Sequence, residues 1–69
     1  MKMNDDDLIE ELKVFLNNKT YIWVKTIDRF YNGYVIKINS NFFIIKDDVL
    51  DKIPVFFKDI KKIQPSIKK

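Results

Sequence analysis

The side chains able to do chemistry in this 69-residue chain are lysines, carboxylates, amides and aromatic rings, because the sequence contains no histidine and no cysteine. It therefore lacks an imidazole base, a thiolate nucleophile and the Ser-His or Cys-His pairs that activate nucleophiles. Disulfides are excluded, and a zinc site would have to be built from carboxylates alone. We predict a protein that is not an enzyme, with no cofactor, no bound metal and no small-molecule substrate.

Charge is distributed unevenly along the chain. Residues 1–12 carry a net charge of −4 and residues 13–69 carry +7, so the overall +3 combines an acidic start with a basic body. A basic body favours polyanions, above all nucleic acids, through neutralisation of their phosphates. The alternative is that the lysines only keep the protein soluble, and that the abundance of Lys, Ile and Asn reflects an AT-rich genome.

Small polar side chains are concentrated in Asn39, Ser40 and Asn41, between two apolar runs. Amides can donate to and accept from the edge of a base, and Lys58 can neutralise a phosphate, as recognition of single-stranded RNA requires. The alternative is an ordinary turn whose side chains bond to the local backbone, with Lys58 paired to Asp59 at the surface.

Two further groups of residues combine positive charge with possible contacts to RNA. Arg29 is followed by Phe30 and Tyr31, a basic and aromatic combination suited to stacking and cation–π contacts with bases. The densest basic run consists of Lys61, Lys62, Lys68 and Lys69. A solvated edge is the alternative for these lysines. Burial is the alternative for the aromatic residues, because alternation along strands points about half of them inward.

One helix is expected to begin the chain. Its apolar face over residues 4–17 consists of Leu8, Leu12, Phe15 and Leu16, with Ile9 beside them. Asn4 is a suitable N-cap, three aspartates of the first turn suit the positive end of the helix dipole, and Asn17-Asn18 would end the helix. Helix capping therefore explains the acidic cluster without a metal.

Five short strands are expected over residues 20–67, where the apolar period changes to two and β-branched and aromatic residues predominate. Tight connections favour antiparallel pairing of neighbours as a meander, and so many strands in about 50 residues favour a small, strongly bent barrel. Gly33, inside the second strand, indicates sharp bending or a close backbone approach. Pro54 and Pro65 place the fourth and fifth strands on either side of the barrel's opening.

The chain is expected to form one domain over residues 1–69. Small domains commonly reinforce their cores with disulfides, metals or oligomerisation, so self-association is the source of stability that remains. No apolar run approaches the roughly 20 residues that cross a bilayer, and no signal-like apolar segment follows the N-terminus. We therefore expect a cytoplasmic protein without membrane contact.

Two stretches of the chain resemble motifs of a known family. Gly33, Val35, Ile38 and Asn39, followed by the strand from Phe42 to Ile45, resemble the first motif of the Sm-like (LSm) proteins. The stretch VFFKDIKKIQPS resembles the second motif of their Hfq-like form, with Val55, Lys58, Ile60, Pro65 and Ser66 in register. The resemblance covers residues 4–66 and implies a mainly β fold, in which an N-terminal α-helix precedes a five-stranded, strongly bent, antiparallel SH3-like barrel.

The resemblance also implies a mode of action. Sm-like proteins pair the fourth strand of one subunit with the fifth strand of the next, which closes a ring of six or seven subunits. Two turns line the pore, and in this chain they hold Asn39, Ser40 and Asn41, and Phe57, Lys58 and Asp59. Asn41 occupies the family's base-stacking position, and Phe43 occupies that of the amide that reads uracil.

We therefore predict a non-catalytic homo-oligomeric ring, hexameric or heptameric, that binds single-stranded RNA. The predicted RNA-binding residues are Asn39, Ser40, Asn41, Lys58, Arg29, Tyr31, Lys61 and Lys62. Two alternatives stay open. One is a protein-interaction or assembly module of the same barrel fold whose RNA pocket has been lost, as Asn41 and Phe43 suggest, and the other is a small basic barrel that binds DNA.

Overall fold

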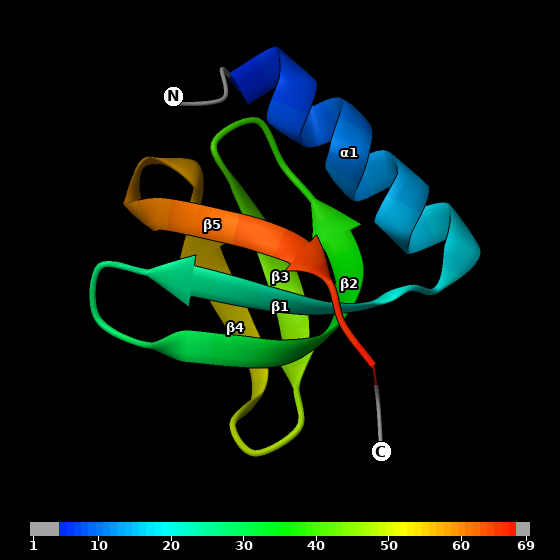
Figure 1. The fold of residues 1–69 in the computed structure, drawn as a ribbon. Helices are drawn as coiled ribbons and strands as arrows, with labels where there is room; N and C mark the ends of the chain where they lie inside the picture. Colours follow the sequence, from blue (N-terminus) through cyan, green and yellow to red (C-terminus); the bar gives the residue numbers. More distant parts are fainter. Residues whose placement is uncertain (1–4, 68–69) are drawn as a thin grey trace.

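The computed structural model describes residues 5–67, in which one helix precedes five strands (Figure 1). The elements are α1 (Asp5–Asn18), β1 (Tyr21–Thr26), β2 (Phe30–Ile38), β3 (Phe42–Asp47), β4 (Asp51–Phe56), the single-turn 3-10 helix η1 (Phe57–Asp59) and β5 (Ile60–Pro65). The predictions for Asn4, Lys68 and Lys69 lie outside the described residues. No helix in residues 5–67 is long and apolar enough to cross a membrane.

Helix α1 buries the apolar face that the sequence predicts. Leu8, Leu12 and Phe15 are buried, while the acidic first turn is exposed. The helix includes Asn18 and therefore ends one residue later than expected. Lys19 ends it by adopting a left-handed conformation with φ of 52°. The N–H of Thr20 donates to the carbonyl of Phe15 at 3.0 Å and that of Lys19 to the carbonyl of Leu16 at 3.3 Å. This pair of bonds is a Schellman motif, with lysine in the place that glycine usually takes.

The strands form one antiparallel sheet in the order β4-β3-β2-β1-β5. The predicted meander is confirmed for β1 to β4, but it is wrong for the last step, because β5 pairs with β1 and not with β4. The turn η1 redirects the chain, and the N–H of Ile27 beside β1 donates to the carbonyl of Asp59 at 3.1 Å. Irregular register in β2 and between β1 and β5 lets the sheet bend, so that its last strand reaches the first.

Gly33 is a point of close backbone approach between β2 and β3. A Cβ atom at this position would lie 1.9 Å from the carbonyl oxygen of Lys46. No side chain can be accommodated at that distance, which explains why glycine stands inside an otherwise bulky strand. The predicted close backbone approach is confirmed.

The two prolines lie in the edge strands β4 and β5, as predicted. The N–H of Phe57 donates toward β3, to the carbonyl of Asn41 at 3.0 Å, so alternation along the strand points position 54 toward the open edge. The N–H of Ser66 donates toward β1, to the carbonyl of Tyr21 at 2.8 Å, which in the same way points position 65 outward. Each proline therefore removes a donor from an open edge and breaks no bond within the sheet.

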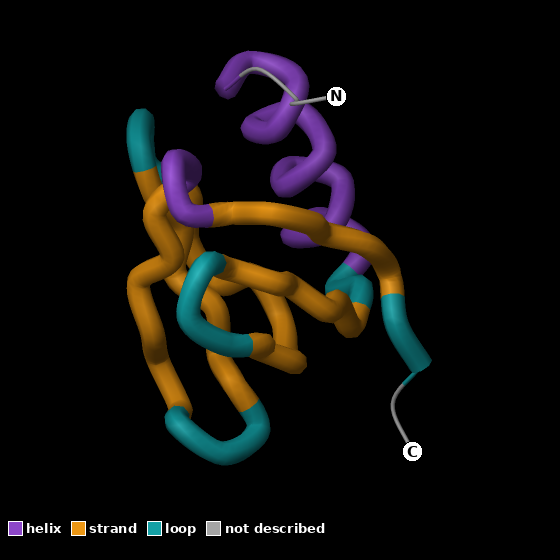
Figure 2. The backbone as a smooth tube through the Cα atoms, turned by 60° about the vertical axis from the view of Figure 1, so that its left-hand side comes forward, coloured by secondary structure: helices purple, strands orange, loops and turns teal. Residues whose placement is uncertain are grey.

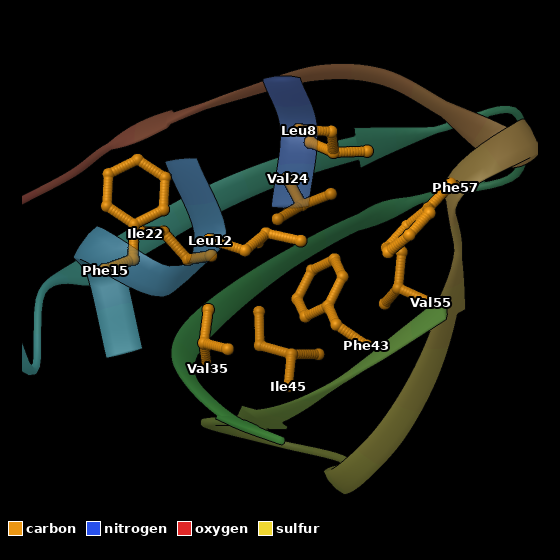
Figure 3. Packing of buried hydrophobic residues seen from close by; sticks show 10 residues of the cluster. All are labelled: Leu8, Leu12, Phe15, Ile22, Val24, Val35, Phe43, Ile45, Val55 and Phe57. Carbon is orange, nitrogen blue, oxygen red and sulfur yellow. The ribbon is translucent and has the colours of Figure 1, made fainter. Parts of the chain in front are cut away.

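The core lies between α1 and the concave face of the sheet (Figure 3). Its buried side chains are Leu8, Leu12, Phe15, Ile22, Val24, Val35, Phe43, Ile45, Val55 and Phe57. Phe57, expected in a turn that lines a pore, is instead part of this core and is 4% exposed. Tyr31, expected among the exposed aromatic residues, is half-buried and packs against the core. Tyr31 lies on the same face of β2 as the buried Val35, and Phe57 points inward from the turn η1.

Candidate nucleic-acid interface

The turn between β2 and β3 and the turn η1 lie side by side at one end of the barrel (Figure 2). The bond from Phe57 N–H to the Asn41 carbonyl joins them, and the N–H of Asn39 donates to the carbonyl of Phe42 at 2.8 Å. Within residues 5–67 the amide side chains of Asn39 and Asn41 form no hydrogen bond. The turn is therefore held by its backbone, which leaves the side chain of the exposed Asn41 available to a ligand.

A cleft of about 570 Å³ opens beside these two turns. It is lined by Asp5, Leu8, Asn41, Phe56, Phe57, Lys58, Ile60, Lys61, Lys62 and Ile63. The lining combines the start of α1, the end of β4, η1 and β5, and it holds four of the eight residues predicted to bind RNA. We call it the lysine cleft. Its apolar side chains offer contact to a flat ring, and three lysines offer contact to negative charge.

The lysines of this cleft have no partner within the described chain. Lys58, Lys61 and Lys62 are exposed, and none of their side chains forms an ion pair or hydrogen bond with another residue of 5–67. The expected alternative of a surface pair between Lys58 and Asp59 is therefore not found, whereas Lys13 and Glu10 on α1 do pair at 3.5 Å. The three positive charges remain available to phosphates.

The other four predicted residues lie outside the cleft lining. Asn39 and Ser40 belong to the β2–β3 turn. Asn39 begins the turn and is half-buried, whereas Ser40 lies in its middle and is exposed. Arg29 is exposed in the turn between β1 and β2, where its carbonyl accepts from the N–H of Thr26 at 2.9 Å and from the Thr26 hydroxyl at 3.0 Å. Tyr31 points toward the core, so the aromatic neighbour of Arg29 on the outer face is Phe30.

An aromatic and basic patch on the outer face of β1, β2 and β5 was missed by the sequence reasoning. Trp23 and Phe30 stack with ring centroids 5.3 Å apart, and the ammonium of Lys25 lies 5.8 Å from the Phe30 ring centroid. Lys62 stands opposite Lys25 in the β1–β5 register and so joins this patch to the lysine cleft. Alternation places Trp23 and Lys25 on one face, but only the β1–β2 register brings Phe30 beside them.

The turn between β3 and β4 lies at the opposite end of the barrel (Figures 1 and 2). It brings together the acidic residues Asp47, Asp48 and Asp51. The buried Asp47 carboxylate accepts from the backbone N–H groups of Asn32, Val49 and Leu50, each at 2.9 Å. Burial alone would raise the pKa of Asp47, but these three bonds and the charge of Arg29 together lower it below its ordinary value.

The neighbouring Asp48 is also engaged. The hydroxyl of Tyr21 donates to its carboxylate, and this bond, followed by desolvation and the Asp48 charge, raises the pKa of Tyr21 to about 12. A smaller cleft of about 340 Å³ beside the turn is lined by Tyr34, Lys46, Asp47, Asp48, Val49 and Asp51. Residues 5–67 contain no cluster of three acidic side chains arranged to hold a metal ion.

Comparisons with known proteins identify a solved structure of the same fold, but no matching family model and no matching curated protein. Among solved structures, the chain is similar to the 1.55 Å crystal structure of the pleiotropic translational regulator Hfq, with a TM-score of 0.75 at 12% sequence identity. The match covers 84% of this chain and 97% of that chain. The N-terminal helix, the bent five-stranded sheet and this match agree. The chain therefore has the Sm-like fold seen in Hfq.

Proposed function

We propose that this protein is a non-catalytic RNA-binding protein that acts as a homo-oligomeric ring and holds single-stranded RNA. The observation that carries the proposal is the lysine cleft, in which Asn41, Lys58, Lys61 and Lys62 converge around an apolar floor. These residues come from two separate segments of the chain, the β2–β3 turn and the continuous stretch of η1 and β5. The solved structure with the same fold is that of a translational regulator, Hfq. Because translation acts on RNA, this likeness adds support to the proposal.

Single-stranded RNA suits the cleft for chemical reasons. An unpaired base has an apolar face that can lie on Leu8 and Ile63, while its edge reaches the Asn41 amide. The phosphates on either side of that base would contact the exposed lysines. A rigid duplex keeps its bases stacked inside, so it would engage the lysines but not the floor.

The outer patch extends the path of the strand. Trp23 and Phe30 provide a stacked aromatic surface, and Lys25 and Lys62 lie beside it on neighbouring strands. Base stacking on aromatic side chains contributes about 1–3 kcal/mol per base. Since Lys62 belongs to both surfaces, a strand leaving the cleft along β5 would pass directly onto the patch, toward Arg29 in the adjacent turn.

The open edges of the sheet support the proposed ring. β4 and β5 each have one unpaired side, and each keeps part of its outward hydrogen-bonding groups despite Pro54 and Pro65. Phe42 and Phe56 are in ring contact, with centroids 5.3 Å apart, on the outer face beside the β4 edge, and Phe56 is exposed. Pairing β4 of one subunit with β5 of the next would cover both edges and this apolar surface.

RNA binding is tested by fluorescence anisotropy with labelled U-rich, A-rich and random single-stranded RNAs at low and moderate salt. We expect the triple variant Lys58→Ala, Lys61→Ala, Lys62→Ala to bind at least about 10-fold more weakly and with a smaller salt dependence. A matched control removes three exposed lysines elsewhere, Lys37, Lys46 and Lys52, for the same change in net charge. Equal losses in both variants, or no binding by the wild type at low salt, would contradict the proposed site.

Self-association is tested separately by size-exclusion chromatography with light scattering at micromolar concentration. We expect a closed oligomer of six or seven subunits. A substitution of Phe56 by Lys should shift it toward monomers, because the charge would lie beside the β4 edge. A strict monomer in the wild type would exclude the ring while leaving RNA binding open.

A protein-interaction or assembly module is the second candidate function, and one observation favours it. Phe43, at the position where the Sm-like resemblance implies an amide that reads uracil, is 0% exposed and lies in the core. If no nucleic acid binds in the anisotropy assay, this candidate predicts that the oligomer forms nonetheless. Stronger binding of duplex DNA than of RNA in the same assay would favour a DNA-binding barrel.

A further inference from the structure

Asp5 is the one acidic side chain among the described residues that line the lysine cleft. It begins α1 and is exposed, and it shares the lining with Asn41 and the three lysines. The lysines can neutralise any phosphate, so they cannot distinguish one base from another. If the cleft selects a base, the selection would depend on Asp5 and Asn41, the two lining side chains whose polar groups could meet the edge of a base.

These two side chains differ in what they can recognise. An amide has both a donor and an acceptor, so Asn41 can adapt to the edge of any base. A carboxylate accepts hydrogen bonds through two oxygens and donates none. Asp5 is therefore a selective group, suited to a base that presents donors and unsuited to one that presents carbonyl oxygens.

Guanine and uracil lie at the two extremes of this property. The Watson–Crick edge of guanine carries two adjacent donors, the N1–H and the N2 amino group, which match the two oxygens of a carboxylate. The corresponding edge of uracil has one N–H between two carbonyl oxygens, and these would be repelled by a carboxylate. Adenine and cytosine each offer one amino group beside a ring nitrogen that accepts.

We propose that Asp5 is a specificity-determining residue of the lysine cleft and gives it a preference for guanine over uracil. The inference rests on the proposed RNA-binding function and concerns the same cleft. The Asp5 carboxylate accepts from N1–H and N2–H of a guanine that lies on the apolar floor, while the lysines hold the flanking phosphates. A good bidentate contact of this kind distinguishes bases by about 10-fold or more.

Asp6 provides a matched control within the same turn of the same helix. It is exposed and acidic like Asp5, but it does not line the cleft. Asp5→Asn and Asp6→Asn remove the same charge from the start of α1 and weaken the interaction with the helix dipole to a similar extent. A difference in base preference between them therefore cannot arise from net charge or from helix stability.

The experiment compares the wild-type chain, D5N and D6N in binding to two labelled hexamers, all-uridine RNA and the same RNA with one central guanosine. We expect the wild type and D6N to bind the guanosine hexamer about 10-fold more tightly, and D5N to lose most of this ratio. Circular dichroism melting confirms that each variant is folded.

Each other outcome overturns the inference in an identifiable way. A wild type that binds both hexamers equally, or a D5N variant that keeps the ratio, contradicts base selection by Asp5. If D5N binds both RNAs more tightly by the same factor, the carboxylate acts only by repelling phosphate, and the inference fails while RNA binding stands. If the wild type binds neither RNA at low salt, the proposed function fails together with the inference.

Discussion

The two ends of this barrel carry opposite charge, and they use that charge differently. At the β3–β4 turn the carboxylate of Asp47 accepts three backbone hydrogen bonds and that of Asp48 accepts one from Tyr21. At the lysine cleft Lys58, Lys61 and Lys62 have no partner within residues 5–67. The acidic end therefore uses its charges to hold the chain together, whereas the basic end leaves its charges available.

Whether a charged side chain already has a partner distinguishes structural charges from candidate functional charges better than the size of the neighbouring cleft does. Both ends have a cleft, of about 340 Å³ and 570 Å³. A carboxylate that already accepts backbone bonds would have to release them before it could bind a ligand, at a cost of about 1–3 kcal/mol for each unsatisfied group. An exposed lysine without a partner has nothing to release. The comparison predicts large effects on stability at one end and large effects on binding at the other.

The largest expected effect comes from Gly33, which holds β2 against the strand that leads to the acidic turn. Gly33→Ala places a methyl group against the carbonyl of Lys46, so we expect a loss of about 3 kcal/mol in the free energy of unfolding. Urea denaturation followed by tryptophan fluorescence measures it. A loss below about 0.5 kcal/mol would mean that the two strands separate easily, and the contrast between the ends would lose its structural basis.

Asp47 should show the next largest effect. Asp47→Ala leaves the N–H groups of Asn32, Val49 and Leu50 without their acceptor, and we expect a loss of about 2 kcal/mol. Asp51→Ala is unsuitable as a control, because Asp51 has a left-handed φ of 66° that alanine adopts only with strain. Lys46→Ala, on the other strand of the hairpin, serves instead. Comparable stability of the Asp47 variant and the control would show that the turn does not depend on this carboxylate.

The pH dependence of stability tests the same carboxylate without changing the wild-type fold. Because the folded-state pKa of Asp47 is lowered, the ionised form stabilises the fold above the unfolded pKa of about 3.9, and this contribution is lost as pH falls through the folded value. Urea denaturation from pH 7 to pH 2 should therefore show a steeper loss in the wild type than in Asp47→Asn. Parallel curves would contradict the role of Asp47.

Tyr21 gives a spectroscopic measure of the other carboxylate in the turn. Ultraviolet titration should detect one tyrosine with a pKa of about 12, and Asp48→Asn should move that value toward the ordinary value of about 10. The sign at high pH follows, since neutral Tyr21 stabilises the fold below the unfolded pKa and this contribution is lost as pH rises through about 12. Three tyrosines titrating together in the wild type would contradict this bond.

The smallest expected effect on stability is at the lysine cleft. The triple variant of Lys58, Lys61 and Lys62 to Ala should change the free energy of unfolding by about 0.5 kcal/mol or less, because these side chains are exposed and have no partner in the described chain. The same denaturation assay measures it. A large destabilisation would mean that these lysines support the fold, and a loss of RNA binding could then not be assigned to direct contacts.

Much of the fold could be predicted from local patterns. The apolar face of α1, the five strands, the close approach at Gly33 and the edge positions of Pro54 and Pro65 all follow from periodicity and from backbone chemistry. The meander pattern predicted the wrong partner for β5, although Pro54 and Pro65 already indicated that β4 and β5 flank the opening; the pairing of β5 with β1 needs more than local patterns. It depends on the bend of the whole sheet and on the direction that η1 imposes on the chain, both of which are long-range properties.

The site was predicted less completely than the fold. Asn41, Lys58, Lys61 and Lys62 were recognised by residue type and by motif, and they do line one cleft. Trp23 and Asp5 were missed as possible ligand contacts, because nothing in their sequence neighbourhood indicates which face or which distant segment they meet. Phe30 was predicted only as an aromatic neighbour of Arg29, without its stacking partner Trp23. Strand register places Phe30 beside Trp23, and the packing of α1 places Asp5 at the cleft.

The sequence by itself determined which side chains are available and which chemistry is excluded. With no histidine or cysteine, an acidic start and a basic remainder, the candidate chemistry was contact with a polyanion and not covalent catalysis. Only the tertiary structure decided which charges are already engaged. The physical reason is that the partners of a charged side chain can be distant in the sequence. Asp47 accepts locally from Val49 and Leu50, but its bond from Asn32, and whether the Lys58 side chain meets a partner, depend on how the sheet bends and closes.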